Sequence, residues 1–399
     1  MKKLYCVELL KVAVVWCVLF NSSAPARANQ PVYIAMATVG NAGNAADIGT
    51  GYGARAYVFR IGKYDVTQSQ YAAFLNAVAA TDTYGLYDTR MATDLIIAGI
   101  SRSGTSGSYT YAVIGTGNQP IGHVTWFSAA RFANWMHNGQ PSGAQGPATT
   151  EQGTYTLNGA TSGIILKNAG AQFWIPTGNE WYKAAYYDPT LNSGTGGYWQ
   201  YPTRSNTPPG NVVGSGTNQA NIYVNGTGYS VTQSTATNLS QNYLTDVGSY
   251  TGSAGYYGTF DMGGNVFQWN DDVISGTKRG FRGGSWAGSA AFLLSSYNPG
   301  VIPTQGNEDY GFRISALESP PVTAAETVPP SIAVSGSNVS ITVKGSVKGR
   351  TYQLQMCDDL VAGNWQDIGL AQSGTGSDLV ISTVYDPVAP HRFYRLKLS

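Results

Sequence analysis

The chain's candidate metal ligands and general bases are its three histidines, His123, His137 and His391. A zinc or iron site needs three or four well-placed ligands, of which imidazole is a common one. His391 lies near the C-terminus, and the other two flank a predicted helix at no metal-ligand spacing. We interpret all three as structural or surface residues.

The adjacent carboxylates Asp271 and Asp272 and the thiol of Cys357 are the other groups that could do chemistry. Neighbouring residues of a strand point to opposite sides, so we expect the aspartates at a turn or a solvated edge rather than in a catalytic dyad. No base is identifiable near Cys357, which we expect to be a buried structural thiol. G-x-S-x-G, phosphate-loop and H-E-x-x-H motifs are missing from the sequence, which therefore predicts no catalytic residue.

Composition restricts the fold that must position these residues. Of 399 residues, 50 are Gly, and charged residues make up 11%, against about 25% in an ordinary soluble domain. The residues of a coiled coil are scarce, and the glycines lack collagen's period of three. A content of 42% hydrophobic and 12% aromatic residues is enough to build a core. The balanced charge gives no basic surface for nucleic acid. A loop-rich globular protein remains.

The N-terminus has the pattern of a secretory signal. Basic residues at 2–3 precede an apolar stretch at 12–20, and small residues follow at 26–28. We therefore predict a signal peptide over 1–28, cleaved after Ala28, and a protein that is secreted, periplasmic or on the cell surface. Nine apolar residues cannot span a bilayer, which needs about 20, so no transmembrane anchor is expected. The alternative is a buried N-terminal strand or helix. Cleavage would leave one cysteine and no internal disulfide.

The rest of the chain divides into three parts. Residues 30–316 are predicted to form one large domain, and the Pro-rich segment 317–330 a linker. Residues 331–399 contain short runs that alternate polar and apolar side chains, at 340–344, 352–356 and 392–396. Such runs with glycine-rich turns between them predict a small antiparallel β-sandwich.

Three helices are predicted in the large domain. The first runs from Thr67 to Val78, where Thr67 and Gln70 form a capping box. The second covers about 127–136, and the third begins at Thr177 with Glu180 three residues later. Long Gly, Ser, Thr and Asn stretches separate the helices, so loops are expected to carry any function.

Six motifs in a fixed order identify a family. They are FRIGKYDVT at 59–67, QPIGHVTW at 119–126, IPTGNEW at 175–181, GNVFQW at 264–269, RGGSW at 282–286 and GFR at 311–313. In this order they resemble the formylglycine-generating enzyme, or sulfatase-modifying factor, family over about residues 31–315. The resemblance implies a C-type-lectin-like α+β fold with much irregular structure.

These motifs also have local physical interpretations. Gly283 and Gly284 indicate a tight backbone passage where no Cβ fits. Trp126, Trp181, Trp269 and Trp286 are expected core aromatics whose N–H groups need partners. Arg313 is expected to pair with a carboxylate or with carbonyls, and Glu180 is the candidate partner.

The family's oxidase chemistry is not expected here. The resemblance implies two cysteines shortly after the Gly-Gly-Ser motif, which bind copper(I) as thiolates. Gly288 and Leu293 occupy those positions, so no copper is expected. The iron enzymes of the family carry their histidines in an additional helical domain, for which this chain has no counterpart.

The resemblance also implies calcium sites. The matching positions are Asn221, Ile222, Asn265, Val266 and Gln268, where the family's usual Glu is replaced by Gln268. Calcium takes six to eight oxygen ligands, and losing a carboxylate weakens such a site. The first site lacks a clear Asp, and Asn238 and Asp246 are candidates. Alternatively, these side chains hydrogen-bond loop backbone.

Two functions compete. The first is a non-catalytic secreted protein that binds a carbohydrate or protein ligand at the cell surface through segment 287–310. The second is an enzyme of the same fold with different oxidoreductase chemistry, metal-dependent or not, which would require a buried carboxylate or a metal near Ser285. A purely structural envelope or matrix protein is a third option. The predicted ligand-binding residues are Arg282, Ser285, Trp286, Phe292, Tyr297, Asn298, Asn307 and Tyr310.

Overall fold

The computed structural model describes residues 32–317 without interruption, and parts of the C-terminal region: 331–335, 338–344, 346, 351–357, 365–375, 377–384 and 393–398. The predicted signal peptide (1–28), the predicted linker apart from residue 317, and His391 lie outside the described residues, and so does the side chain of Cys357. The chain divides into two compact units, Met1–Ala316 and Leu317–Ser399.

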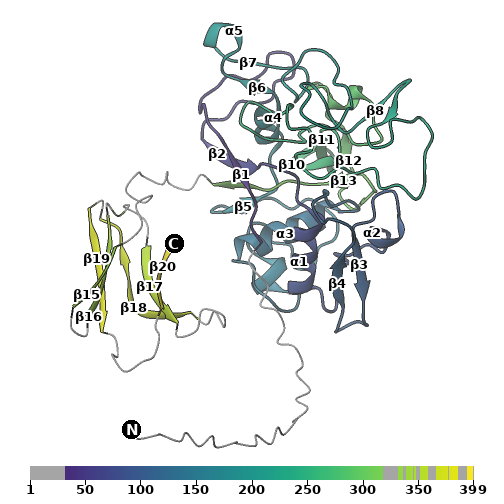
Figure 1. Ribbon diagram of the computed structural model, residues 1–399. Coiled ribbons are helices and arrows are strands. Elements are labelled where there is room, and N and C mark those ends of the chain that lie inside the picture. Colours follow the sequence, from purple (N-terminus) through teal and green to yellow (C-terminus); the bar gives the residue numbers. More distant parts are fainter. Residues whose placement is uncertain are drawn as a thin grey trace, which may run out of the picture. The chain divides into compact units, whose positions relative to one another are not determined.

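The first unit is a mixed α/β structure with short elements and long loops, as predicted (Figure 1). Its two larger sheets have the orders β1-β2-β14-β5 and β12-β11-β10-β13. The strands of the first sheet are β1 (Met36–Val39), β2 (Phe59–Gly62), β14 (Ser315–Leu317) and β5 (Phe173–Trp174). Those of the second are β12 (Gly300–Val301), β11 (Lys278–Arg282), β10 (Phe267–Ser275) and β13 (Tyr310–Gly311).

Three two-stranded sheets and a set of helices complete this unit. The small sheets pair β3 (Ile100–Ser103) with β4 (Thr110–Val113), β6 (Tyr187–Asp188) with β7 (Gly197–Tyr198), and β8 (Tyr223–Val224) with β9 (Gly228–Tyr229). The helices are α1 (Gln68–Val78), α2 (Arg90–Thr93), α3 (Trp126–His137), α4 (Gly178–Tyr186) and α5 (Leu191–Gly194), with a π turn η1 (Pro147–Glu151) and a 3-10 turn η2 (Ala290–Leu293).

The three predicted helices are confirmed as α1, α3 and α4, each within a residue of its expected start. Thr67 and Gln70 close the capping box of α1, and Thr177 and Glu180 that of α4. These boxes satisfy backbone N–H groups that would otherwise lack partners at the helix start. Helices α1 and α3 lie side by side (Figure 1), and their facing rings of Phe74 and Phe132 are 5.3 Å apart.

The main core of the unit lies between α1, α3 and the second sheet, and contains Trp126, Trp269 and Phe312, all buried. A second cluster joins β1 and β2 to α4, with Trp181 at its centre. The close passage expected at the Gly-Gly pair is present. Gly283 and Gly284 have φ of 99° and 70°, and a Cβ on Gly284 would lie 2.4 Å from the Leu293 side chain.

The described residues of the second unit form two three-stranded antiparallel sheets. Their orders are β15-β16-β19 and β18-β17-β20, and strands occur at all three predicted positions. Side chains from both sheets, including Ile341 and Tyr352, share one apolar cluster. The strands are β15 (Ser331–Ser335), β16 (Asn338–Val343), β17 (Thr351–Cys357), β18 (Gln366–Ser373), β19 (Leu379–Val384) and β20 (Phe393–Leu398).

None of the described helices has the length and apolar character needed to cross a bilayer.

Candidate functional site

The eight predicted ligand-binding residues fall into a buried set and an accessible set. Arg282, Ser285 and Trp286 are at most 4% exposed. The accessible set has five members. Phe292 and Asn307 are exposed, and Tyr297, Asn298 and Tyr310 are half-buried. Only the residues of the accessible set could therefore contact a ligand directly.

Three rings of segment 287–310 form one aromatic patch together with Phe267 of β10; the three are Phe292, Tyr297 and Tyr310. The ring centroids of Phe292 and Tyr297 are 5.0 Å apart, and Phe267 lies 6.1 Å from Phe292. Tyr310 reaches the patch through Phe281, which it meets at 4.3 Å and on which Phe267 stacks at 4.6 Å. Partly exposed rings of this kind bury much area on binding at a low cost in conformational entropy.

Asn298 and Trp286 lie away from this patch. Asn298 donates from Nδ2 to the Tyr52 hydroxyl at 2.9 Å. The indole of Trp286 stacks on Tyr243 at 5.0 Å inside the molecule. Both residues therefore belong to the support of segment 287–310.

Arg282 binds the backbone of segment 287–310 from inside the protein. Its guanidinium lies 4.6 Å from the ring of Tyr52 and 5.1 Å from that of Tyr182. Nη1 donates to the carbonyls of Ser295 and Tyr297, at 3.2 and 3.1 Å. Burial lowers the pKa of Arg282 from its ordinary value. The residue positions the loop that carries Tyr297.

A carboxylate lies beside Ser285, and it belongs to Asp309, one of the two acidic residues of segment 287–310. The Ser285 hydroxyl donates to Oδ2 of Asp309 at 2.6 Å. Burial raises the pKa of Asp309 to about 6, and Glu308 adds to the increase while the Ser285 hydrogen bond opposes it. A carboxyl that titrates near 6 exchanges a proton readily near neutral pH.

The two positions of the family's cysteines form a packed region rather than an open groove. Leu293 is fully buried in an apolar cluster with Tyr201, Ala220 and Ile222. A Cβ on Gly288 would lie 2.7 Å from the Phe292 ring. Van der Waals contacts therefore fill the space where thiolates would be needed.

The five predicted calcium residues, Asn221 and Ile222 of the first expected site and Asn265, Val266 and Gln268 of the second, are held by contacts within the protein. Asn221 and Asn265 meet, but the Oδ1 of Asn265 already accepts from Asn221 Nδ2 at 3.0 Å and from the Thr245 amide at 3.1 Å. The main-chain oxygen of Ile222 accepts from Asn211. Val266 is buried among apolar side chains.

Gln268 is engaged elsewhere. Its Oε1 accepts from Trp181 Nε1 at 2.6 Å and from Arg313 Nε at 2.8 Å. Within the described residues, no three His, Cys, Asp or Glu side chains could together hold a metal ion. The side-chain oxygens of Asn265 and Gln268 and the main-chain oxygen of Ile222 serve N–H donors of the protein, so these three residues, as arranged, do not fit the ion.

Arg313 pairs with a carboxylate, but Glu180 is not the partner. Nε of Arg313 lies 3.4 Å from Oδ1 of Asp65, and Nη1 of Arg313 donates to the carbonyl of Gly62 at 3.0 Å. Glu180 instead accepts from the Tyr57 hydroxyl at 2.6 Å and from Trp174 Nε1 at 2.9 Å. Its side chain is committed to the start of α4 and cannot also reach Arg313.

The expectation of a turn or solvated edge for Asp271 is wrong. Asp271 lies on β10, its side chain is 8% exposed, and it pairs with Arg279 at 3.2 Å. Burial raises its pKa to about 7. His123 is buried and lies 3.3 Å from Asp94, and His137 Nδ1 accepts from the Gln172 amide at 3.1 Å. These groups are structural and do not form a common site.

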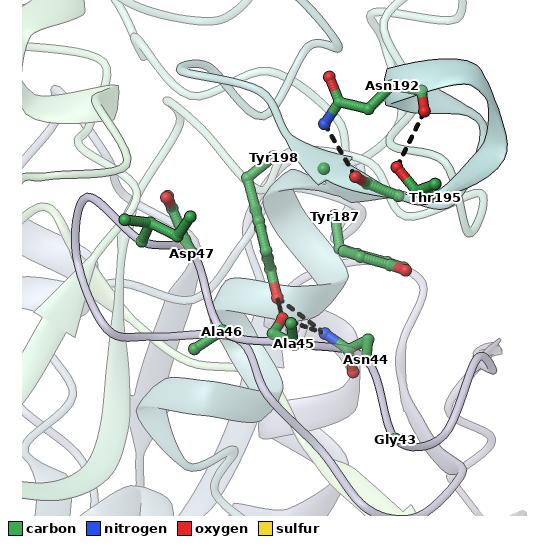
Figure 2. Close-up of a pocket in the computed structure, with 12 residues that line it drawn as sticks. Gly43, Asn44, Ala45, Ala46, Asp47, Tyr187, Asn192, Thr195 and Tyr198 are labelled. Atoms are coloured by element: carbon green, nitrogen blue, oxygen red, sulfur yellow. Dashed lines mark hydrogen bonds between the residues drawn. The ribbon is translucent and has the colours of Figure 1, made fainter.

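A cavity of about 500 Å³ lies elsewhere in the first unit, and the motif analysis missed it. Two segments line it, 43–48 and the region from Tyr187 to Tyr198 (Figure 2). The cluster of glycines at 194–197 beside two tyrosines was the available sequence signal. Nothing in the sequence indicated that segment 43–48 would fold against it.

Comparison with known proteins assigns the family. The model of the sulfatase-modifying factor enzyme 1-like domain matches residues 40–316, and the chain belongs to this family. The match covers the unit that contains the aromatic patch, the Ser285–Asp309 pair and the cavity. No curated protein matches the chain.

Three solved structures are similar in fold. CarF has a TM-score of 0.43 and 23% identity, over 72% of this chain and 99% of its own. Variable protein 1 of Treponema denticola has a TM-score of 0.41 and 18% identity, over 72% of this chain and 96% of its own. PvdO from Pseudomonas aeruginosa has a TM-score of 0.36 and 18% identity, over 71% of this chain and 92% of its own.

Proposed function

We propose that this protein is an exported, non-catalytic member of its family that binds a ligand through the surface of segment 287–310. The observation that carries the proposal is the complete burial of Leu293 where a copper-binding thiolate would be required. A leucine side chain has no group that coordinates a metal. Reactivating this site would require rebuilding the packing around η2.

The aromatic patch supports a binding role. Phe292 is 36% exposed although it packs against Tyr297, and the exposed Asn307 adds an amide beside it. Aromatic residues are enriched in protein interfaces, where a fully apolar ring is an effective anchor. A protein ligand at the cell surface is therefore favoured over a carbohydrate, since sugars more often require polar partners at the ring edge. Export rests on the signal pattern at 1–28.

The test is a binding screen of the mature chain, residues 29–399, against surface proteins by pull-down and against a glycan array. We expect Phe292→Ala and Tyr297→Ala each to lower the affinity for a bound partner at least fivefold, which is the loss typical of a central interface residue. Tyr33→Ala is the matched control, because Tyr33 is 80% exposed and lies outside the segment. A partner whose affinity both patch variants leave unchanged would show that the surface is misassigned.

An enzyme with different chemistry is the second candidate, and one observation favours it. Asp309 is a half-buried carboxylate beside Ser285, which is where such an enzyme would require one. If it acts in a reaction, Asp309→Asn abolishes turnover while the fold is retained. Oxygen-uptake assays with thiol peptides, with and without added metal ions, test the oxidase form. Turnover that depends on Asp309 would replace the binding proposal.

A further inference from the structure

The cavity of about 500 Å³ is separate from segment 287–310. Its lining residues come from segment 43–48, from Tyr187, from Asn192 on α5, and from Thr195 to Tyr198. In Figure 2 the rings of Tyr187 and Tyr198 lie between the two segments. Ligand pockets commonly have volumes of about 300–1,000 Å³, so the space suits a small molecule.

Hydrogen bonds hold both walls in place. Asn44 donates from Nδ2 to the Tyr198 hydroxyl at 2.7 Å, and that hydroxyl donates to the Ala45 carbonyl at 2.7 Å. On the opposite wall, Asn192 Nδ2 donates to the Gly196 carbonyl at 2.9 Å, and the Thr195 hydroxyl to the Asn192 carbonyl at 2.8 Å. A site fixed in this way loses little conformational entropy when it binds a ligand.

The wall at 192–196 also has an unusual backbone. Asn192 and Ser193 have φ of 53° and 58°, and Gly194 and Gly196 are positive as well. A Cβ on Gly196 would lie 2.3 Å from the Tyr187 hydroxyl. Glycine at this position therefore lets that hydroxyl reach the lining of the cavity. Left-handed conformations at non-glycine residues carry a cost in free energy, and they concentrate at functional sites.

Several groups of the lining are available to a ligand. Among the described residues, no hydrogen bond engages the Tyr187 hydroxyl or the side-chain oxygen of Asn192. Ile48, another residue of the lining, is fully exposed and offers an apolar surface. The one charged residue, Asp47, is already engaged, because its Oδ2 accepts from Tyr182 at 2.5 Å and its Oδ1 from the Gly49 amide at 3.0 Å.

We propose that this cavity is a second binding site, which takes a neutral pyranose sugar. Tyrosine rings and an exposed aliphatic side chain suit the C–H face of a sugar ring. A free hydroxyl and an amide oxygen suit its hydroxyl groups. The lining contains no cationic side chain that would select an anion, and both oxygens of its one carboxylate, Asp47, already accept hydrogen bonds from the protein.

The test is saturation-transfer NMR on the mature chain with methyl glycosides of glucose, galactose, mannose and N-acetylglucosamine at about 10 mM. We expect transfer to at least one glycoside. Thr195→Trp, which fills the cavity from an exposed position, should abolish the transfer. The matched control Thr217→Trp, at an exposed threonine outside the lining, should leave it unchanged.

Tyr187→Phe separates binding from structure, because it removes a hydroxyl that forms no hydrogen bond within the described residues. It should raise the dissociation constant of the bound glycoside about three- to tenfold, as expected for one neutral hydrogen bond. No transfer to any glycoside would overturn the proposal, and so would transfer that Thr195→Trp leaves intact. Because these variants lie outside segment 287–310, failure here leaves the test of that surface unaffected.

Discussion

Replacing Asp309 with asparagine should make the protein more stable at neutral pH. Burial raises the pKa of Asp309 to about 6, against 3.8 for a free aspartate. Below about pH 4 the carboxyl is protonated in both the folded and the unfolded chain, so it does not change the free energy of unfolding. As the pH rises from about 4 to 6, the unfolded chain releases its proton first, so stability falls. Above pH 6 the ionised form costs about 3 kcal/mol.

Asparagine resembles the protonated carboxyl, since its oxygen still accepts from Ser285. We therefore expect Asp309→Asn to match the wild type near pH 4 and to exceed its unfolding free energy by up to about 3 kcal/mol at pH 7. Urea unfolding followed by tryptophan fluorescence measures this, because Trp126, Trp181 and Trp269 are buried in the first unit.

Asp246→Asn is the matched control for this experiment. Asp246 is half-buried and accepts from the Thr116 hydroxyl at 2.7 Å, so the change removes an equal charge from another hydrogen-bonded carboxylate. We expect it to alter stability by less than about 1 kcal/mol at either pH. An Asp309→Asn variant that is less stable than the wild type at pH 7, or that differs equally at pH 4 and 7, would refute the reasoning.

Two further predictions test the packing and the ion site. Leu293→Ala should lower the free energy of unfolding by about 2–5 kcal/mol, because it empties a fully buried position; a loss below about 1 kcal/mol in urea unfolding would contradict the packed arrangement. Neither calcium nor a chelator should shift the melting temperature by more than about 1 °C, because Asn265 and Gln268 use their oxygens internally. A calcium-dependent rise of several degrees would show that these side chains rearrange around the ion.

The helices could be predicted from the sequence because their signals are local. The capping box of Thr67 and Gln70 lies within four residues, and the structure contains it as predicted. The burial of the four motif tryptophans also follows from local patterns. The partners expected for their N–H groups are found for Trp181 and Trp269, which donate to carbonyl oxygens, but Nε1 of Trp126 and of Trp286 has no hydrogen-bond partner among the described residues. In both cases one stretch of chain contains the information.

Contacts between distant segments could not be predicted in the same way. Arg313 meets Asp65, about 250 residues earlier, and nothing in either motif distinguishes Asp65 from Glu180 as the partner. Asp271 is buried because Arg279 returns beside it across the irregular pairing of β10 and β11. A bulge moves side chains from one face of a strand to the other, so alternation alone misplaces them.

The cavity shows the same limit most clearly. Segment 43–48 has no periodicity, and its partner lies about 150 residues later, with the Asn44–Tyr198 contact joining them. Among the described residues, the groups free to bind a ligand there are a hydroxyl and an amide oxygen. Such groups are common in any sequence, and only their shared location distinguishes them.

The order of strands in the first sheet has a consequence for how the chain reaches this structure. Strand β14 lies between β2 and β5, so the last strand of the unit is an interior member of its sheet. The Gly62 amide donates to the Ile314 carbonyl at 2.7 Å, and Val66 to Phe312 at 3.0 Å. During synthesis the sheet therefore stays open until residues 312–317 emerge. Contacts that close over such a long stretch of chain make folding slow, because the entropy of ordering the intervening chain is lost before the contacts form.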